Sequence, residues 1–251
     1  MKELNVAIKS AKESGKILMI YFDKTIKINR KSDNSPVTIA DRKSERKIAS
    51  IINKYFPEHN ILAEEFRYKQ TNSHYKWIID PLDGTKNFIR GVPFFGNCIA
   101  LEKNGKIVAG VVNMPAINLF AYASSGNGSF INGKKVKVSN VNQLSDAFLS
   151  FGSVNSFLDI HKNQFNTLIK SCYGHRGFGD TLMCLLLAQG HLDIVLDYFL
   201  NSWDIAALKI IIEEAGGRVT DFKGNNNIYS GNCIATNGKL HEKVLKIFNK
   251  K

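Results

Sequence analysis

The sequence predicts an α+β protein that becomes α/β in character toward its C-terminus and folds as two tightly packed lobes. Three observations predict this class: two amphipathic segments near the N-terminus, short strand-like runs joined by Asn-Gly pairs, and a later alternation of strands with helices. We expect an N-terminal α+β lobe over residues 1–145 and a C-terminal α/β lobe over residues 146–251. A chain of 251 residues can bury a substantial core, and no long linker interrupts it.

The first 60 residues predict two helices. Residues 4–22 space apolar side chains three or four positions apart, namely Leu4, Ala7, Ile8, Ala11, Ile17, Leu18 and Tyr21. Residues 41–56 repeat this pattern, and Pro57 is expected to end the helix. Between them, residues 31–36 form a polar loop of the kind that often carries functional residues, although turn chemistry alone would explain its composition.

Strands and hairpins are expected next, followed by the alternating region. Strand-like runs cover residues 77–80, 98–101, 107–112 and 119–123, and hairpin turns are indicated at Asn104-Gly105, Asn127-Gly128 and Asn132-Gly133. Gly126-Asn127-Gly128 lacks the third glycine of a dinucleotide-binding fingerprint. After Phe148 we expect a helix over 182–188, a strand over 194–196, and a helix over 205–215 that Gly216-Gly217 ends.

The composition is that of a globular, basic protein. Thirty-four basic against 22 acidic side chains give a formal charge of +12, which would suit nucleic acid, an anionic surface or a phosphorylated substrate. No basic run reaches the length of an interaction tail, so a lysine-rich surface is the favoured interpretation. The four cysteines are too far apart for a Cys-x-x-Cys pair. No secretory h-region or run of roughly 18 apolar residues is present, so we expect a cytoplasmic protein with no membrane partner.

The string Asp80-Pro81-Leu82-Asp83-Gly84-Thr85 follows the apolar residues 77–79, and it predicts a strand that delivers two carboxylates to a turn. Pro81 fixes its own φ angle, and Gly84 permits backbone geometry that other residues resist. If Gly84 and Thr85 open a helix, their backbone amides point outward and can bind phosphate.

Two carboxylates beside a phosphate dianion are tolerable only if cations lie between them. Hard oxygen ligands favour Mg²⁺ or Mn²⁺. The alternative is a plain surface turn, the usual meaning of Asp-Pro or Asp-Gly alone, but the whole string favours the metal interpretation.

Three further acidic motifs accompany this string: Glu64-Glu65, Asp41 after Thr38, and Asp204 within Trp203-Asp204-Ile205-Ala206-Ala207. Each has a structural alternative when taken alone. Glu64-Glu65 would be a solvated turn, Asp41 a helix N-cap, and Asp204 another N-cap beside a buried Trp203.

In this order, the motifs resemble those of the inositol monophosphatase superfamily of metal-dependent, lithium-sensitive phosphatases, from Lys31 through Gly217. The resemblance implies a layered αβαβα sandwich of the sugar-phosphatase type, usually assembled as a homodimer. It also implies a phosphomonoesterase in which a metal-activated water attacks a small phosphorylated metabolite directly, without a covalent intermediate.

Site roles follow from the resemblance. It implies two or three Mg²⁺ ions, with Mn²⁺ as a substitute, one bound by Glu64, Asp80 and the Leu82 carbonyl and a second by Asp80, Asp83 and Asp204. Glu65, counted with the catalytic residues, would support the site from beside it. Thr85 and Asp41 would position the attacking water, and the amides of Gly84 and Thr85 would bind the phosphate. The six histidines lack ligand spacing and are expected to be structural or solvated.

Substrate choice is expected to depend on Asp83, Asp180 and Asp197. Gly179-Asp180 stands where inositol monophosphatases usually carry small residues, and it is similar to the Gly-Asp of histidinol-phosphate phosphatases, as is the loop over residues 31–38. A carboxylate there suits a cationic amine better than a polyol. Thr181-Leu182, however, replaces the Cys-Tyr that follows in that branch.

Two alternatives remain open. Adenosine 3′,5′-bisphosphate phosphatases share the Ser-Pro-Val-Thr and Asp-Pro-Leu-Asp-Gly-Thr-Lys strings, so a bisphosphate ranks third after histidinol phosphate and inositol phosphate. Some bacterial members of the superfamily act through RNA or the transcription machinery, and a charge of +12 would suit that role. No RNA-recognition motif with interleaved aromatic residues is visible in the sequence.

Overall fold

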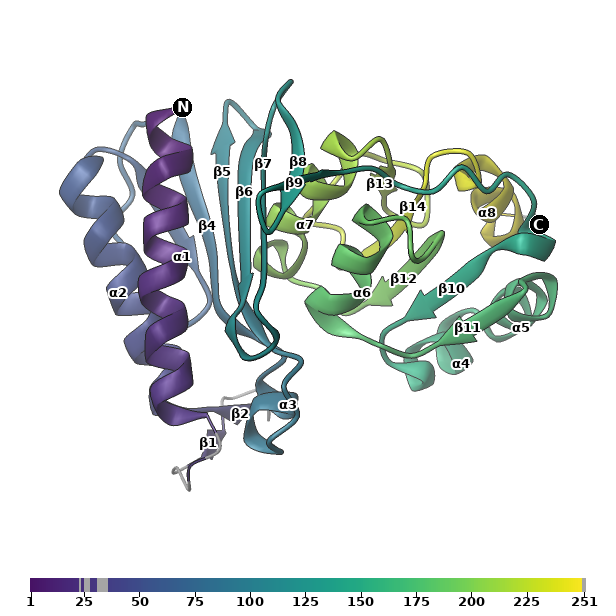
Figure 1. The fold of residues 1–251 in the computed structure, drawn as a ribbon, viewed down its shortest axis with the longest axis horizontal. Helices are drawn as coiled ribbons and strands as arrows, with labels where there is room; N and C mark the ends of the chain where they lie inside the picture. The colour runs from purple at the N-terminus through teal and green to yellow at the C-terminus, as the bar shows by residue number, and fades with distance from the viewer. Residues whose placement is uncertain (23, 25–27, 31–35, 250–251) are drawn as a thin grey trace.

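Two β-sheets alternate with three layers of helices, so the expected layered αβαβα sandwich is confirmed (Figure 1). The computed structural model describes residues 1–22, 24, 28–30 and 36–249. Most of the polar loop expected over residues 31–36 therefore lies outside the described residues. The order of the layers is α1 and α2, a 7-stranded sheet, α6 and α7, a 5-stranded sheet, and finally α4, α5 and α8. The helices are α1 (Lys2–Tyr21), α2 (Ile39–Tyr55), α3 (Thr85–Ile89), α4 (Val154–Ile160), α5 (Lys162–Ser171), α6 (Asp180–Ala188), α7 (Ser202–Glu214) and α8 (His241–Phe248).

The 7-stranded sheet follows the chain in order from β3 to β9. Its strands are β3 (Asn60–Ala63), β4 (Tyr75–Asp83), β5 (Gly96–Lys103), β6 (Lys106–Met114), β7 (Leu119–Ser124), β8 (Gly128–Ile131) and β9 (Lys134–Val136). The hairpins expected at the three Asn-Gly pairs are confirmed. At Asn104-Gly105, both residues have positive φ angles of 49° and 76°, as a two-residue turn between twisted strands requires.

The 5-stranded sheet has the order β11-β10-β12-β14-β13, in which β10 runs parallel to both of its neighbours. Its strands are β10 (Phe148–Phe151), β11 (Gly174–Arg176), β12 (Ile194–Tyr198), β13 (Arg218–Thr220) and β14 (Asn232–Thr236). The remaining elements are the small antiparallel pair β1 (Asn29–Arg30) and β2 (Pro36–Val37) and two 3-10 turns, η1 (Pro115–Ile117) and η2 (Leu144–Asp146).

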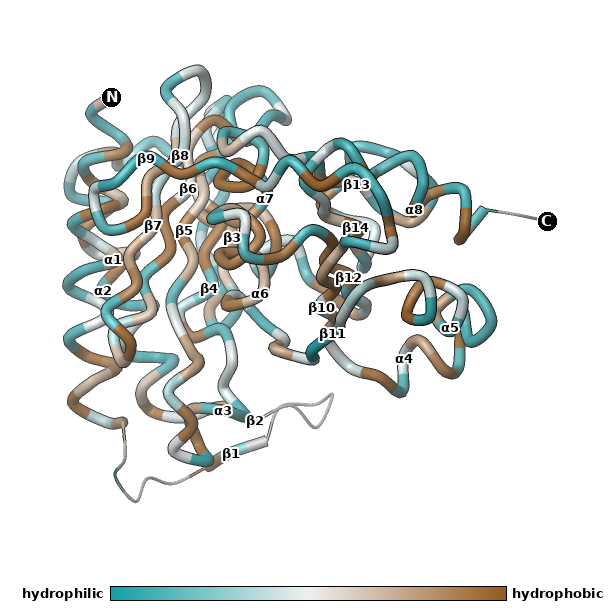
Figure 2. Tube along the Cα trace, turned by 45° about the vertical axis from the view of Figure 1, so that its right-hand side comes forward, coloured by the Kyte–Doolittle hydropathy of each residue, from teal (hydrophilic) through white to brown (hydrophobic). Residues whose placement is uncertain are grey.

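Apolar clusters fill the spaces between the layers. One joins α1 and α2 to the first sheet around the fully buried Trp77, and a second surrounds α6 and α7 between the two sheets. A third packs Phe157, Phe165 and Phe222 against the outer face of the second sheet. In Figure 2, hydrophobic colour accordingly follows β12 and α7 through the middle of the molecule.

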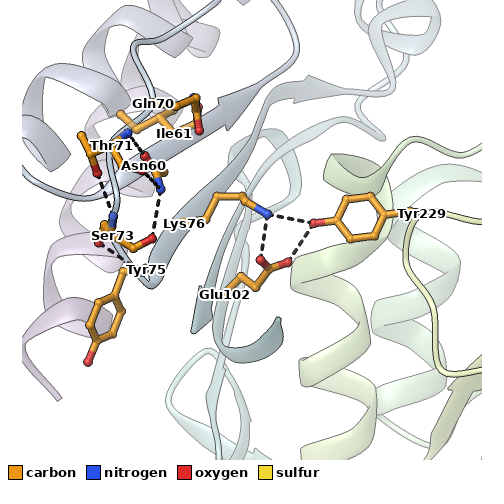
Figure 3. Close-up of polar contacts among 9 residues, drawn as sticks. All are labelled: Asn60, Ile61, Gln70, Thr71, Ser73, Tyr75, Lys76, Glu102 and Tyr229. Atoms are coloured by element: carbon orange, nitrogen blue, oxygen red, sulfur yellow. Dashed lines mark hydrogen bonds and ion pairs between the residues drawn. The ribbon is translucent and has the colours of Figure 1, made fainter. Parts of the chain in front are cut away.

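A polar contact also joins the two halves of the chain (Figure 3). Lys76 Nζ on β4 lies 2.8 Å from Glu102 Oε1 on β5 and donates to the Tyr229 hydroxyl at 3.3 Å. Tyr229, from the loop between β13 and β14, donates in turn to Glu102 Oε2 at 2.8 Å. This triad ties strands β4 and β5 of the first sheet to the C-terminal part of the chain.

Among the described residues, no helix is long and apolar enough to cross a membrane. The helix starts differ by a few residues from those expected: α1 begins at Lys2, α2 at Ile39 and α7 at Ser202. The end of α2 at Tyr55 agrees with the stop expected at Pro57.

His241 is fully buried, and its ring connects two strands. Its Nε2 lies 2.9 Å from the Thr220 hydroxyl and its Nδ1 lies 3.1 Å from the Thr236 hydroxyl. Burial, together with the nearby charge of Arg218, lowers the pKa of His241 from 6.5 to about 4. The imidazole is therefore neutral in the folded protein at neutral pH.

We predict that this histidine weakens the fold in acid. Because the pKa is lower in the folded state, the unfolded chain binds the proton first as the pH falls, so the contribution is complete above pH 6.5 and is lost toward pH 4. Between pH 7 and pH 5, wild type should lose about 2 kcal/mol of unfolding free energy that His241→Gln does not lose. Urea denaturation of both proteins at the two pH values measures this difference. If the difference in unfolding free energy between wild type and His241→Gln were the same at pH 7 and pH 5, the role assigned to His241 would be contradicted.

Candidate active site

A cavity of about 1040 Å³ lies where β4, α6, β12 and α7 meet. It is lined by carboxylates from both halves of the chain, namely Glu64, Asp80, Asp83, Asp159, Asp180, Asp197 and Asp204. Leu82, Gly84 and Thr85 line it too. The structure therefore brings together the residues that the sequence pointed to, except that Asp41 and Glu65 are not among those lining the cavity. Asp41 reaches the cavity wall through Thr85.

The turn after β4 has the geometry that the sequence predicted. The pairing of β4 with β5 is irregular between Asp80 and Asp83, and Asp80 Oδ1 accepts a hydrogen bond from the Leu82 amide at 2.9 Å. Gly84 has a φ angle of 77° and precedes α3, so the expected helix start at Thr85 is confirmed. A Cβ at Gly84 would lie 2.8 Å from the Phe94 carbonyl oxygen, so only glycine fits.

Asp41 is held in place by the start of α2. Thr38, rather than Asp41, is the N-cap, and Asp41 is the third helical residue of a capping box. Its Oδ2 accepts hydrogen bonds from the Thr38 amide at 2.8 Å and the Thr38 hydroxyl at 2.6 Å. Its Oδ1 lies 3.4 Å from Thr85 Oγ1, which is also 3.0 Å from the Leu82 carbonyl oxygen. Burial raises the pKa of Asp41 to about 6.

Asp204 repeats this arrangement on α7. Asn201 is the N-cap, Asp204 is the third helical residue, and its Oδ2 accepts from the Asn201 amide at 2.6 Å. The alternatives that treated Asp41 and Asp204 as N-caps are thus wrong by three positions, and Trp203 is half-buried rather than buried. Burial, with the charge of Asp83, raises the pKa of Asp204 to about 8.

Glu45 is a supporting residue that the sequence reasoning missed. It is fully buried on α2, one turn after Asp41, and accepts hydrogen bonds from the amides of Glu65 at 2.7 Å and Phe66 at 2.8 Å. It thereby fixes the backbone that carries Glu64 and Glu65. A glutamate on the apolar face of an amphipathic helix was the signal available in the sequence.

Asp83 connects β4 to α6. Its Oδ2 accepts a 2.7 Å hydrogen bond from the Thr181 amide and another from the Thr181 hydroxyl. The threonine that replaces the cysteine of the histidinol-phosphatase branch therefore orients one of the expected metal ligands, a role that the sequence did not reveal.

Asp180 and Asp197 face the same cavity from α6 and β12. Asp180 is exposed as a residue, but its carboxyl group lies next to Gly84 and accepts from Asn87 Nδ2 at 2.8 Å. Asp197 is buried, and its carboxyl group occupies the space that a Cβ at Gly152 would need. Burial of the carboxyl groups, with the charge of Asp83, raises the pKa of each to about 7.

The donor set fits a hard divalent cation. Burial and the charges of Glu64, Asp83 and Asp204 raise the pKa of Asp80 well above its usual range, so a cation would relieve strong repulsion. All of the candidate ligands are oxygen atoms, as Mg²⁺ prefers. Within residues 1–22, 24, 28–30 and 36–249, no three acidic, imidazole or thiol groups converge on one point in this conformation. Asp83 and Asp204 each direct an oxygen to a backbone amide instead.

The comparisons with known proteins show the family to which this chain belongs. The model of the inositol monophosphatase family matches residues 2–251. The fructose-1,6-bisphosphatase/inositol-1-monophosphatase of Thermotoga maritima is 37% identical over 99% of this chain and 96% of its own length. A histidinol-phosphatase of Mycobacterium tuberculosis is 36% identical over 98% of both chains. The Nus factor SuhB of Pasteurella multocida is 34% identical over 96% of this chain and 94% of its own.

Solved structures share the whole fold. The extragenic suppressor protein suhB of Bartonella henselae superposes with a TM-score of 0.93 at 32% identity, over 100% of this chain and 99% of that one. An IMPase/NADP phosphatase complexed with Mg²⁺ and phosphate reaches a TM-score of 0.84 at 25% identity, over 96% of this chain and 92% of that one. The chain belongs to the inositol monophosphatase family, as its motifs indicated, and it is a phosphatase.

We predict that Mg²⁺ stabilises this protein through Asp204. At Mg²⁺ about 100-fold above the dissociation constant, the melting temperature should rise by about 5–10 °C. Asp204→Asn should lose most of this rise, yet melt higher than wild type in EDTA, because burial and the charge of Asp83 disfavour the ionised carboxylate and the amide is neutral. Thermal melts with and without Mg²⁺ measure both effects. Asp159→Asn, an exposed carboxylate on the same cavity, is the matched control and should keep the rise. If Mg²⁺ raised the melting temperature of Asp204→Asn as much as that of wild type, the assignment of Asp204 as a metal ligand would be contradicted.

Glu45 should affect the metals without touching them. Glu45→Gln places an amide nitrogen against one of the two N–H groups that the carboxylate accepts, so the turn carrying Glu64 shifts. We expect Mg²⁺ affinity to fall about tenfold, as for other residues that orient metal ligands, while the circular dichroism spectrum stays unchanged. Calorimetric Mg²⁺ titration provides the measurement, and unchanged affinity would show that Glu45 has no such role.

Proposed function

We propose that this protein is a Mg²⁺-dependent phosphomonoesterase that hydrolyses a small phosphorylated alcohol. The observation that carries the proposal is that Glu64, Asp80, Asp83 and Asp204 line one cavity, beside the turn at Gly84-Thr85. The four carboxylates and the Leu82 carbonyl would hold Mg²⁺. The backbone amides of Gly84 and Thr85 would bind the phosphate.

The proposed reaction is direct displacement at phosphorus. When bound, Mg²⁺ supplies positive charge to the phosphate and makes water more acidic. Thr85 Oγ1 orients the attacking water, and Asp41 Oδ1 accepts a proton through Thr85. The water oxygen forms a bond to phosphorus while the ester P–O bond breaks, and the leaving alcohol oxygen takes up a proton from solvent water. Asp41 then returns its proton to solvent. Asp41, with a pKa of about 6, is ionised for this task at neutral pH.

Histidinol phosphate is the first candidate substrate and inositol monophosphate the second. Asp180 supports this order, because its carboxyl group lies next to Gly84, where the alcohol adjoining a phosphate bound at the turn would lie. With Asp197, it would offer two carboxylates to a cationic amine. The similarity to a histidinol-phosphatase supports this choice, and the similarity to a fructose-1,6-bisphosphatase/inositol-1-monophosphatase supports the second.

A phosphate-release panel tests the proposal. It contains histidinol phosphate, inositol 1-phosphate, adenosine 3′,5′-bisphosphate and fructose 1,6-bisphosphate, each with and without Mg²⁺ and Li⁺. Asp83→Asn should reduce Mg²⁺-dependent release by at least about a hundredfold without unfolding the protein, since it removes a proposed ligand at a polar cavity. Full activity in this variant would refute the assignment.

The same panel separates chemistry from substrate choice. Asp180→Ala should change the ranking of the substrates, with the greatest loss for the cationic one, while its Mg²⁺ dependence stays as in wild type. An equal loss on all four substrates would remove Asp180 from the choice of alcohol. Inhibition by Li⁺ and a homodimer in light scattering are further expectations of the proposal.

Association with RNA or the transcription machinery is a second candidate function. The similarity to the Nus factor SuhB of Pasteurella multocida and the charge of +12 favour it. RNA binding that weakens steeply with salt and persists in Asp83→Asn would support this role alongside the phosphatase. No binding at low salt would exclude a sequence-independent contact with RNA.

A further inference from the structure

Phe199 has a backbone conformation that bulky residues avoid. Its φ angle is +59°, in the left-handed region, and the residue lines the cavity and is 74% exposed. A left-handed backbone is costly for an aromatic residue, and such strain concentrates at functional sites. Because the ring is so exposed, it contributes little hydrophobic stabilisation to the fold.

The neighbouring residues impose this conformation on Phe199. Tyr198 is the last residue of β12 and pairs with Asn232 of β14, and the Leu200 amide donates to the Gly231 carbonyl at 3.0 Å. Asn201 then caps α7. The backbone is therefore fixed on both sides of Phe199. A glycine at this position would adopt the left-handed conformation without strain. The turn itself therefore does not require an aromatic ring, and the ring of Phe199 lies 6.3 Å, between centroids, from that of Tyr198.

The cavity around Phe199 suggests what the ring contacts. Asp197, two residues earlier, and Asp180 line the same cavity, so an aromatic face and two carboxylates share one space. The face of a phenyl ring is electron-rich and attracts cations, and a flat partner stacks on it with more contact than a puckered one. A polyol ring is neither flat nor charged.

We propose that Phe199 is a specificity-determining residue that stacks against a planar, positively charged group in the alcohol part of the substrate. The proposal rests on the phosphatase function proposed above and deepens it. Asp180 and Asp197 provide the negative charge beside this group, while Phe199 covers its flat face. The cavity thus selects phosphate esters of alcohols that carry both a flat ring and a cationic centre.

The test compares two esters in wild type and Phe199→Gly. Histidinol phosphate carries a planar ring and an ammonium group, whereas glycerol 2-phosphate carries neither. The ratio of kcat/KM for the first ester to that for the second should fall about tenfold in Phe199→Gly, the size of one stacking or cation-π contact, and the loss should be in KM. Phe199→Trp should preserve the ratio. The melting temperature of Phe199→Gly should equal or exceed that of wild type, because glycine relieves the backbone.

Tyr173→Ala serves as the matched control, since Tyr173 is 78% exposed and does not line the cavity. It should leave the ratio unchanged. An unchanged ratio in Phe199→Gly, or an equal loss on both esters, overturns the proposal. So does a change of oligomeric state in Phe199→Gly by light scattering, because the ring would then serve a subunit contact.

A binding measurement separates this proposal from the phosphatase function. If wild type releases phosphate from neither ester, the proposed function fails, and calorimetric binding of histidinol itself then decides the role of Phe199. About tenfold weaker binding of histidinol by Phe199→Gly than by wild type supports the proposal, and equal or undetectable binding by both overturns it.

Discussion

The crowding of carboxylates around the buried Asp80 is the constraint on which the site depends. Burial, together with the charges of Glu64, Asp83 and Asp204, raises the pKa of Asp80 well above its usual range. A fold that brings these groups together must stabilise each one against both effects. Backbone amides do so: Leu82 donates to Asp80, and Thr181 donates to Asp83. Hydrogen bonds to the charged form stabilise it and lower its pKa, so these amides partly offset burial.

Helix starts provide the same support twice. Asp41 and Asp204 are each the third residue of a capping box, and each accepts a hydrogen bond from the N-cap amide of its own helix. Each carboxylate therefore stabilises a helix end. Asp204 also lines the cavity, whereas the other oxygen of Asp41 lies 3.4 Å from the hydroxyl of Thr85, which lines it. Because each residue belongs both to a capping box and to the candidate site, the sequence alone also supports a purely structural interpretation of each. The capping box also places a functional group on a rigid element, where its position varies little.

The sequence predicted those parts of the structure that depend on neighbours in the chain. The helices α1 and α2, the Asn-Gly hairpins and the turn at Gly84 follow from local periodicity and turn chemistry, and the motifs identified the acidic residues. The strand order of the second sheet was not predictable, because β10 pairs with strands that follow it after intervening helices. Glu45 and Thr181 were missed for the same reason, since each acts on a residue 20 or 98 positions away.

The triad of Lys76, Glu102 and Tyr229 has a mechanical consequence for the cavity. One wall of the cavity comes from β4 and the other from β12 and α7, so its width depends on how firmly the two halves of the chain are joined. The triad clamps them at a point on β4 close to its beginning, whereas the acidic turn lies at its end. Because β4 is joined to the C-terminal half at its beginning and packed along its length, the two walls of the cavity resist moving apart. The cavity therefore has a fixed width, and a ligand that fits this width binds with little loss of conformational entropy.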